Sequence, residues 1–255
     1  MASPSRAGVA VPTPSFTVIT FLARDLEYPD QNLAQCVIKG MPIAGAAPPT
    51  PGLTPRETPT ETSYAKWKAE TPTRNKTIIE RAAKAHGSEI SNACWEKSRA
   101  GIQDGWLSKP APLDAVTAGA VALTPRYAHK EEHGGRESKI RVIDDFKASG
   151  INALLETTDT NIPDTIDAFL TAATYYKIID KNAQLQAAST DYRRAYKNLP
   201  IGRDQAEFAS ILLAPPPGPL MVAKLQALPF GSHRAPRIGQ ESPGLLNSHS
   251  TSCFQ

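Results

Sequence analysis

Three stretches of the chain combine acidic, basic and glycine residues in patterns that suit phosphate chemistry. In the first, STDYRRAYKNLPI at 189–201, Asp191 lies among three basic residues. A carboxylate supplies the hard oxygen ligands that Mg²⁺ prefers, and neighbouring Arg and Lys side chains bind phosphate oxygens. This stretch therefore suits a metal-held phosphate site, although a solvated strand end often carries the same mixture of charges.

The other two stretches add cations and a close backbone approach. SKIRVIDDFKASGIN at 138–152 places Lys139 and Arg141 along the apolar core of an expected strand. ALPFGSHRAP at 227–236 contains Gly231, and a glycine allows the backbone to approach a ligand closely. Together the two stretches suit the binding of an anionic ligand.

Composition limits the compartment and the partners. The net charge of the 255 residues is +3, but residues 191–240 hold seven Lys or Arg against three Asp or Glu, which suits a polyanion. Cys36, Cys94 and Cys253 are too few and too dispersed for a disulfide framework or a zinc ribbon, which favours a reducing compartment. No apolar run approaches the roughly 18 to 20 residues of a membrane span, and no convincing signal peptide is present. We therefore expect an intracellular protein of the nucleus or cytoplasm, without membrane association.

A mixed set of helices and strands must position these residues. Apolar residues recur at helical spacing over 76–102, with a break at Gly87. Residues 115–128 are apolar and rich in β-branched side chains, which predicts a strand, and 138–146 predicts another. Helices inserted between strands favour the α+β class.

Two further elements are expected before and after the first stretch. A helix should begin at Asp164, with one apolar face that includes Ile166, Phe169 and Tyr176. Two apolar runs, 207–214 and 219–227, flank the sequence PPPG and predict an antiparallel pair joined by a proline loop.

Proline separates the beginning of the chain from the rest. Eleven of the 23 prolines fall within residues 1–72, and five of them lie within 47–63, where a helix or central strand is disfavoured. We therefore expect a Pro-rich, largely disordered lead-in over 1–65, a folded domain over 66–236, and an irregular tail over 237–255.

In order and spacing, the three stretches resemble the polymerase domain of reverse transcriptases, especially the divergent proteins of retroelements. The resemblance covers about residues 100–236. The first motif is a fingers strand with a basic residue before Asp-Phe, matched by Arg141, Asp145-Phe146 and Ile151-Asn152. The second is a palm motif, matched by Asp191, Ala195-Tyr196 and Leu199-Pro200-Ile201. The third is a Leu-Pro-Phe-Gly turn, matched by Leu228-Pro229-Phe230-Gly231 and Ala235-Pro236. The implied fold is a partial polymerase fingers and palm, with an antiparallel sheet and packed helices.

The resemblance also implies roles for individual residues. Asp191 would be the first catalytic carboxylate and Mg²⁺ ligand, and Tyr196 would lie under the incoming sugar. The remaining residues would contact the triphosphate or line the nucleotide pocket: Lys139, Arg141, Phe230 and Gly231. The implied activity is RNA-directed DNA synthesis, with an RNA or DNA template-primer and a deoxynucleoside triphosphate as partners.

The sequence departs from the family at the second half of the catalytic site. The family holds two metals with the first acid and a later Asp pair in a Tyr-x-Asp-Asp hairpin, but here no aspartate follows Glu207, and Glu241 is the one later acid. We therefore expect a truncated reverse-transcriptase-like fragment that is inactive as an isolated chain.

Two alternatives remain open. The chain could be a non-catalytic nucleic-acid-binding remnant in which four basic residues contact phosphate, namely Arg193, Arg194, Lys197 and Arg203. It could also be a scaffold whose Pro-rich N-terminal region binds partners. The polymerase interpretation further predicts that Arg141 and Asp191 share one concave surface and that Gly231 lies beside Asp191.

Overall fold

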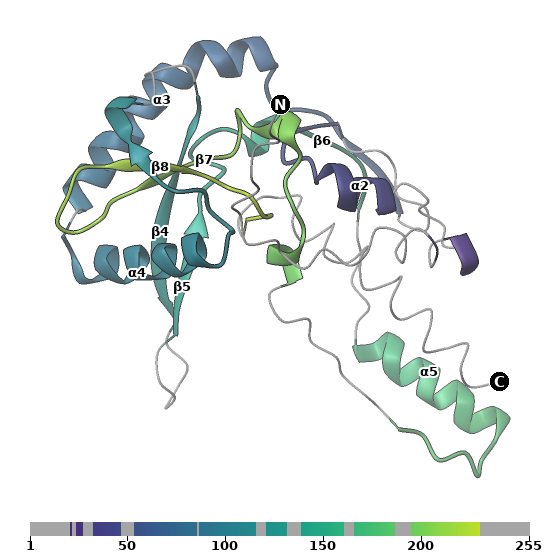
Figure 1. Ribbon diagram of the computed structural model, residues 1–255. Coiled ribbons are helices and arrows are strands. Elements are labelled where there is room, and N and C mark those ends of the chain that lie inside the picture. The colour runs from purple at the N-terminus through teal and green to yellow at the C-terminus, as the bar shows by residue number, and fades with distance from the viewer. Residues whose placement is uncertain are drawn as a thin grey trace, which may run out of the picture.

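A computed structural model of the chain describes residues 21, 24–27, 33–46, 54–85, 87–115, 121–131, 139–160, 166–186 and 195–229. In this part of the chain, four α-helices and two β-sheets form a mixed fold (Figure 1). The α+β class expected from the sequence is therefore confirmed.

The larger sheet has five strands, in the order β3 (Ala111–Pro112), β8 (Met221–Lys224), β7 (Ser210–Leu213), β4 (Leu123–Glu131) and β5 (Lys139–Asp144). β7 pairs with β8 and β4 with β5 in antiparallel fashion, whereas β4 and β7 are parallel. All four residues of β7 are buried, as an uninterrupted apolar strand requires at the centre of a sheet. The predicted antiparallel pair around the proline loop is thus confirmed.

Two helices contact this sheet at β4. In α3 (Tyr64–Ala85) the buried residues recur three or four positions apart, which places them on one stripe. The amide of Asn75 in this helix donates to the carbonyl of Val121 and accepts from the N–H of Leu123, each at 2.9 Å, and so ties α3 to the start of β4. α4 (Glu89–Gln103) begins after Ser88, whose Oγ accepts from the N–H of Ser91.

The break between α3 and α4 lies where the sequence predicts it. Gly87 has a φ of +82°, a conformation that glycine adopts without a steric penalty. The helical region, however, starts at Tyr64 rather than near Asn75, because Trp67 adds a further buried position to the same stripe.

The smaller sheet has the order β1 (Gly45–Ala46), β6 (Leu155–Thr160) and β2 (Thr54–Thr58). β6 lies in the centre, parallel to β1 and antiparallel to β2. Pro55 therefore lies in an edge strand, the place in a sheet where a residue without an N–H is tolerated.

The N-terminal part of the chain is more ordered than its proline content predicts. Val37 of α2 (Leu33–Lys39), and Met41 and Ile43 of the segment that follows it, are buried in the main core. The Oε1 atom of Gln205 accepts from the backbone N–H groups of Ile43 and Ala44, at 3.0 and 3.1 Å. Distant contacts therefore hold residues 33–46 against the core, and the expected lead-in over 1–65 as a whole stays a prediction.

The predicted helix after Asp164 is present as α5 (Ile166–Ile179), but its apolar face is not packed. None of its residues is buried, and Ile178 is 71% exposed. Figure 1 shows α5 standing apart from both sheets. Among the described helices, none combines the length and apolar character that crossing a membrane requires.

Candidate phosphate-binding site

The β4–β5 ribbon positions the basic residues of the 138–152 stretch. In its register, Glu131 lies opposite Lys139, and His129 lies opposite Arg141. Residues that lie opposite each other, or two apart along a strand, share one face of the ribbon. This surface, the ribbon face, comprises Tyr127, His129, Glu131, Lys139 and Arg141.

The ribbon face is open to solvent. Tyr127 is 46% exposed, and the side chains of His129, Lys139 and Arg141 are exposed as well. Figure 1 shows the far end of the ribbon projecting past α4. The two cations predicted to bind a triphosphate are therefore on one accessible surface.

An ion pair restrains one of these cations. The Nε of Arg141 lies 2.6 Å from Oε1 of Glu131, the last residue of β4. The two side chains are 46% and 28% exposed, so the pair lies at the surface. Glu131 could not be identified from the sequence, because its pairing with Arg141 depends on the register of β4 and β5.

The opposite face of the ribbon carries a buried ion pair. Arg126 donates from Nε to Oδ1 of Asp144 at 2.6 Å and from Nη2 to Oδ2 at 2.9 Å. These side chains are only 6% and 3% exposed, and Arg126 also donates from Nη1 to Oγ of Ser98 in α4 at 3.4 Å. The bidentate geometry satisfies both charges away from water and joins β4, β5 and α4.

The two aspartates at the end of β5 have hydrogen-bond partners within the protein. Asp145 accepts two backbone N–H groups at Oδ1, from Lys147 at 3.1 Å and from Ala148 at 2.9 Å, and so closes a turn. Phe146 is completely buried in the core. Asp144 is therefore paired with Arg126, and Oδ1 of Asp145 closes the turn.

The second and third motif stretches lie side by side. Ile201 donates its N–H to the carbonyl of Gln226 at 3.1 Å, and Leu228 donates to Leu199 at 2.9 Å. Pro200 and Ala227 form an antiparallel bridge between these bonds. The Leu-Pro-Ile trio therefore pairs directly with the strand that leads into Leu-Pro-Phe-Gly.

The short helix η3 (Ala195–Asn198) carries two of the predicted site residues. Tyr196 packs against the main core and is half-buried. Lys197 lies with Nζ 5.9 Å from the centre of the Trp106 ring, and burial lowers the pKa of its amine to about 8. The Asp144 carboxylate raises that pKa and the Arg126 guanidinium lowers it, so Lys197 lies within electrostatic reach of the buried pair. Lys197 is half-buried, and the phosphate contact predicted for it stays a prediction.

Several predicted residues lie outside the described part of the chain. These are Asp191, Arg193, Arg194, Phe230 and Gly231. The expected proximity of Asp191 to Arg141 and to Gly231 therefore stays a prediction. Within the described ranges, no group of three His, Cys, Asp or Glu side chains could hold a metal ion, and Arg203 is exposed in η4 (Arg203–Gln205).

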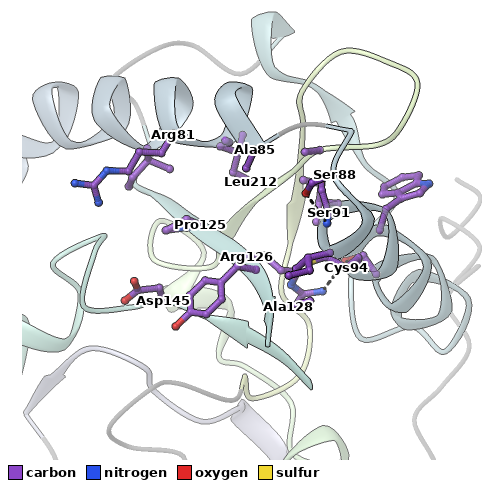
Figure 2. A pocket seen from close by; sticks show the side chains of 18 of the residues that line it. Arg81, Ala85, Ser88, Ser91, Cys94, Pro125, Arg126, Ala128, Asp145 and Leu212 are labelled. Atoms are coloured by element: carbon purple, nitrogen blue, oxygen red, sulfur yellow. Dashed lines mark hydrogen bonds between the residues drawn. The ribbon is translucent and has the colours of Figure 1, made fainter. Parts of the chain in front are cut away.

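A cavity of about 290 Å³ lies between α3, α4 and strands β4 and β7. Figure 2 shows Arg81 and Asp145 on one side of it and Ser88, Ser91 and Cys94 on the other. Burial raises the pKa of the Cys94 thiol to about 11, so this sulfur is protonated near neutral pH and is a poor nucleophile. Arg126 also lines the cavity, and its charge is neutralised by Asp144.

The described geometry thus offers an exposed cationic surface on β4 and β5 and a closely paired segment after η3. No family model and no curated protein matches the chain.

Proposed function

We propose that the chain is a reverse-transcriptase-like fragment that binds nucleic-acid or nucleotide phosphate through Lys139 and Arg141. The resemblance of the three motif stretches is the origin of this proposal. The observation that carries it is the placement of Lys139 and Arg141 on one open ribbon face, where a triphosphate or a strand backbone has access.

The pairing of the later motifs is a second support. Two extended segments, 199–201 and 226–228, are adjacent. The chain therefore continues from neighbouring points toward Asp191 and toward Gly231. A polymerase palm needs such closeness, because both motifs serve one nucleotide.

The 255 residues by themselves do not carry the carboxylates for nucleotidyl transfer. Two cations held about 4 Å apart need several acidic ligands. Asp191 is the one acid of the palm motif, and no aspartate follows Glu207. The proposed activity of this chain alone is therefore binding, without catalysis.

Two measurements on the purified chain test the proposal. Fluorescence anisotropy with a labelled RNA–DNA duplex should show binding that weakens with added KCl, because phosphate contacts release counterions. The slope of log K against log salt should fall by about one in Arg141→Gln. Arg99→Gln provides a matched control, since Arg99 is an exposed arginine that is also paired with a glutamate, Glu96.

Primer extension with Mg²⁺ or Mn²⁺ should give no product. Template-dependent extension that Asp191→Ala abolishes would show that the chain is a complete enzyme and that its predicted inactivity is wrong. Binding with no salt dependence, or with equal loss in Arg141→Gln and Arg99→Gln, would reject the phosphate-binding surface.

A further inference from the structure

The ribbon face contains an anion as well as two cations, and that anion is opposite one cation and ion-paired with the other. Glu131 is opposite Lys139 in the register of β4 and β5. It also forms the 2.6 Å ion pair with Arg141, two residues further along β5. The predicted phosphate-binding guanidinium is therefore already bound to an oxyanion of the protein.

A carboxylate and a phosphate use the same donors of arginine. Both present oxygen atoms to the N–H groups of the guanidinium, and both bind it in bidentate fashion. A phosphate can engage Arg141 fully only where Glu131 moves away from Nε or shares it. We infer that Glu131 is an internal competitor for Arg141, and that it sets the affinity of the ribbon face for a phosphate backbone. This inference rests on the proposed function.

The exposure of the pair makes the competition reversible. Arg141 is exposed, whereas Glu131 is half-buried with its Oε2 atom away from solvent, so water reaches the pair from the side of the arginine, and pairs open to water are weak. A polyanion that contacts Lys139 at the same time can therefore displace Glu131. By contrast, the bidentate Arg126–Asp144 pair on the other face is buried and unavailable for such exchange.

The remaining side chains of the ribbon face favour a single strand as the ligand. Tyr127 is 46% exposed and lies two residues from His129 along β4. An exposed aromatic ring beside cations can stack on an unpaired base while the cations contact its phosphates. A base in a duplex is already stacked, so a duplex would use the cations alone.

A double-mutant cycle tests the competition directly. Anisotropy with a fluorescein-labelled oligothymidylate, over a KCl series, would compare the wild type with Glu131→Gln, Arg141→Gln and the double variant. Glu131→Gln should tighten binding by about two- to fivefold, the range expected for release of an exposed ion pair. In the Arg141→Gln background the same substitution should have a clearly smaller effect.

The pair Glu96–Arg99 on α4 supplies the control. It is also exposed, with atoms 3.2 Å apart, and it lies away from the ribbon face. Glu96→Gln changes the net charge of the protein by the same amount as Glu131→Gln. It should leave oligothymidylate binding almost unchanged, and circular dichroism would verify that each variant is folded.

The outcomes separate the inference from the proposed function. Weaker binding in Arg141→Gln with no gain in Glu131→Gln would overturn the competition and leave the proposed function standing. Binding could also tighten equally in Glu96→Gln and in Glu131→Gln, the latter with or without Arg141→Gln. That result would assign the effect to net charge and would also overturn the competition. No binding by the wild type to either oligothymidylate or duplex would reject both proposals. Tighter binding to duplex than to oligothymidylate would overturn the assignment of a single strand.

Discussion

Gly40 and Gly202 lie against each other, backbone to backbone, where the N-terminal segment meets the Leu-Pro-Ile stretch. A Cβ atom on Gly40 would come within 2.5 Å of the Cα of Gly202. Met41 completes the junction, since its N–H donates to the carbonyl of Pro200 at 2.7 Å and its carbonyl accepts from Gly202 at 3.0 Å. A residue with no side chain is therefore required at position 40.

Gly40→Ala should strongly destabilise the fold. Its φ of +95° disfavours alanine, at a cost of about 1–3 kcal/mol, and the overlap with Gly202 adds about 1–3 kcal/mol. Gly45→Ala is the matched control, because Gly45 has a φ of +86° but no atom within 4 Å of the added Cβ. Urea denaturation should therefore show a larger loss for Gly40→Ala than for Gly45→Ala. Equal losses of stability in the two variants would show that the contact between Gly40 and Gly202 does not add to the cost.

Asp144→Ala should destabilise the protein by about 3–5 kcal/mol, because it leaves the Arg126 guanidinium buried without its partner. Replacing both residues, as Arg126→Met with Asp144→Leu, should recover most of that loss in a thermal or urea melt. Glu96→Gln, at an exposed ion pair, should cost less than about 1 kcal/mol. A small loss for Asp144→Ala would contradict the buried geometry.

Gln205→Met should release the N-terminal segment, because two backbone N–H groups, of Ile43 and Ala44, lose the acceptor Oε1. An unsatisfied buried donor costs about 1–3 kcal/mol. Limited proteolysis should then cut within residues 33–46 faster than in the wild type. Gln226→Met, at an exposed glutamine, should leave the cleavage rate unchanged.

The low pKa of Lys197 predicts a pH dependence of stability. The amine titrates at about 8 in the folded chain, below its ordinary value of 10.5, because burial disfavours the charged form. Between these values the unfolded chain binds more protons, so folding becomes more favourable as the pH rises through this window. The wild type should gain stability relative to Lys197→Met from about pH 8 to 10.5 in urea midpoints. A constant difference across that range would show that Lys197 is not desolvated.

Local patterns predicted the elements whose partners are close in sequence. The β7–β8 pair, the break at Gly87 and the strand at 139–144 each follow from apolar periodicity and from proline or glycine punctuation. The helix α5 was also predicted, but periodicity alone did not reveal that its apolar residues, such as Ile178, are exposed.

Contacts between distant segments were not predictable in this way. Residues 33–46 are ordered by Pro200 and Gln205, which no local proline count can anticipate. The Arg126–Asp144 and Glu131–Arg141 pairs depend on the register of β4 and β5, which is set by the buried side of the ribbon. Lys139 and Arg141 were candidates from the sequence, but the pairing of Glu131 with Arg141 was not predicted.

The bond between Ile43 and Gln205 spans 162 residues, and this separation has a consequence during synthesis. At about 5–20 residues per second, roughly 8 to 30 s pass between the emergence of the two residues from the ribosome. Throughout that interval the backbone N–H groups of Ile43 and Ala44 lack the acceptor that they have in the finished protein. The packing of residues 33–46 can therefore be completed only late in synthesis, after residue 205 has left the ribosome.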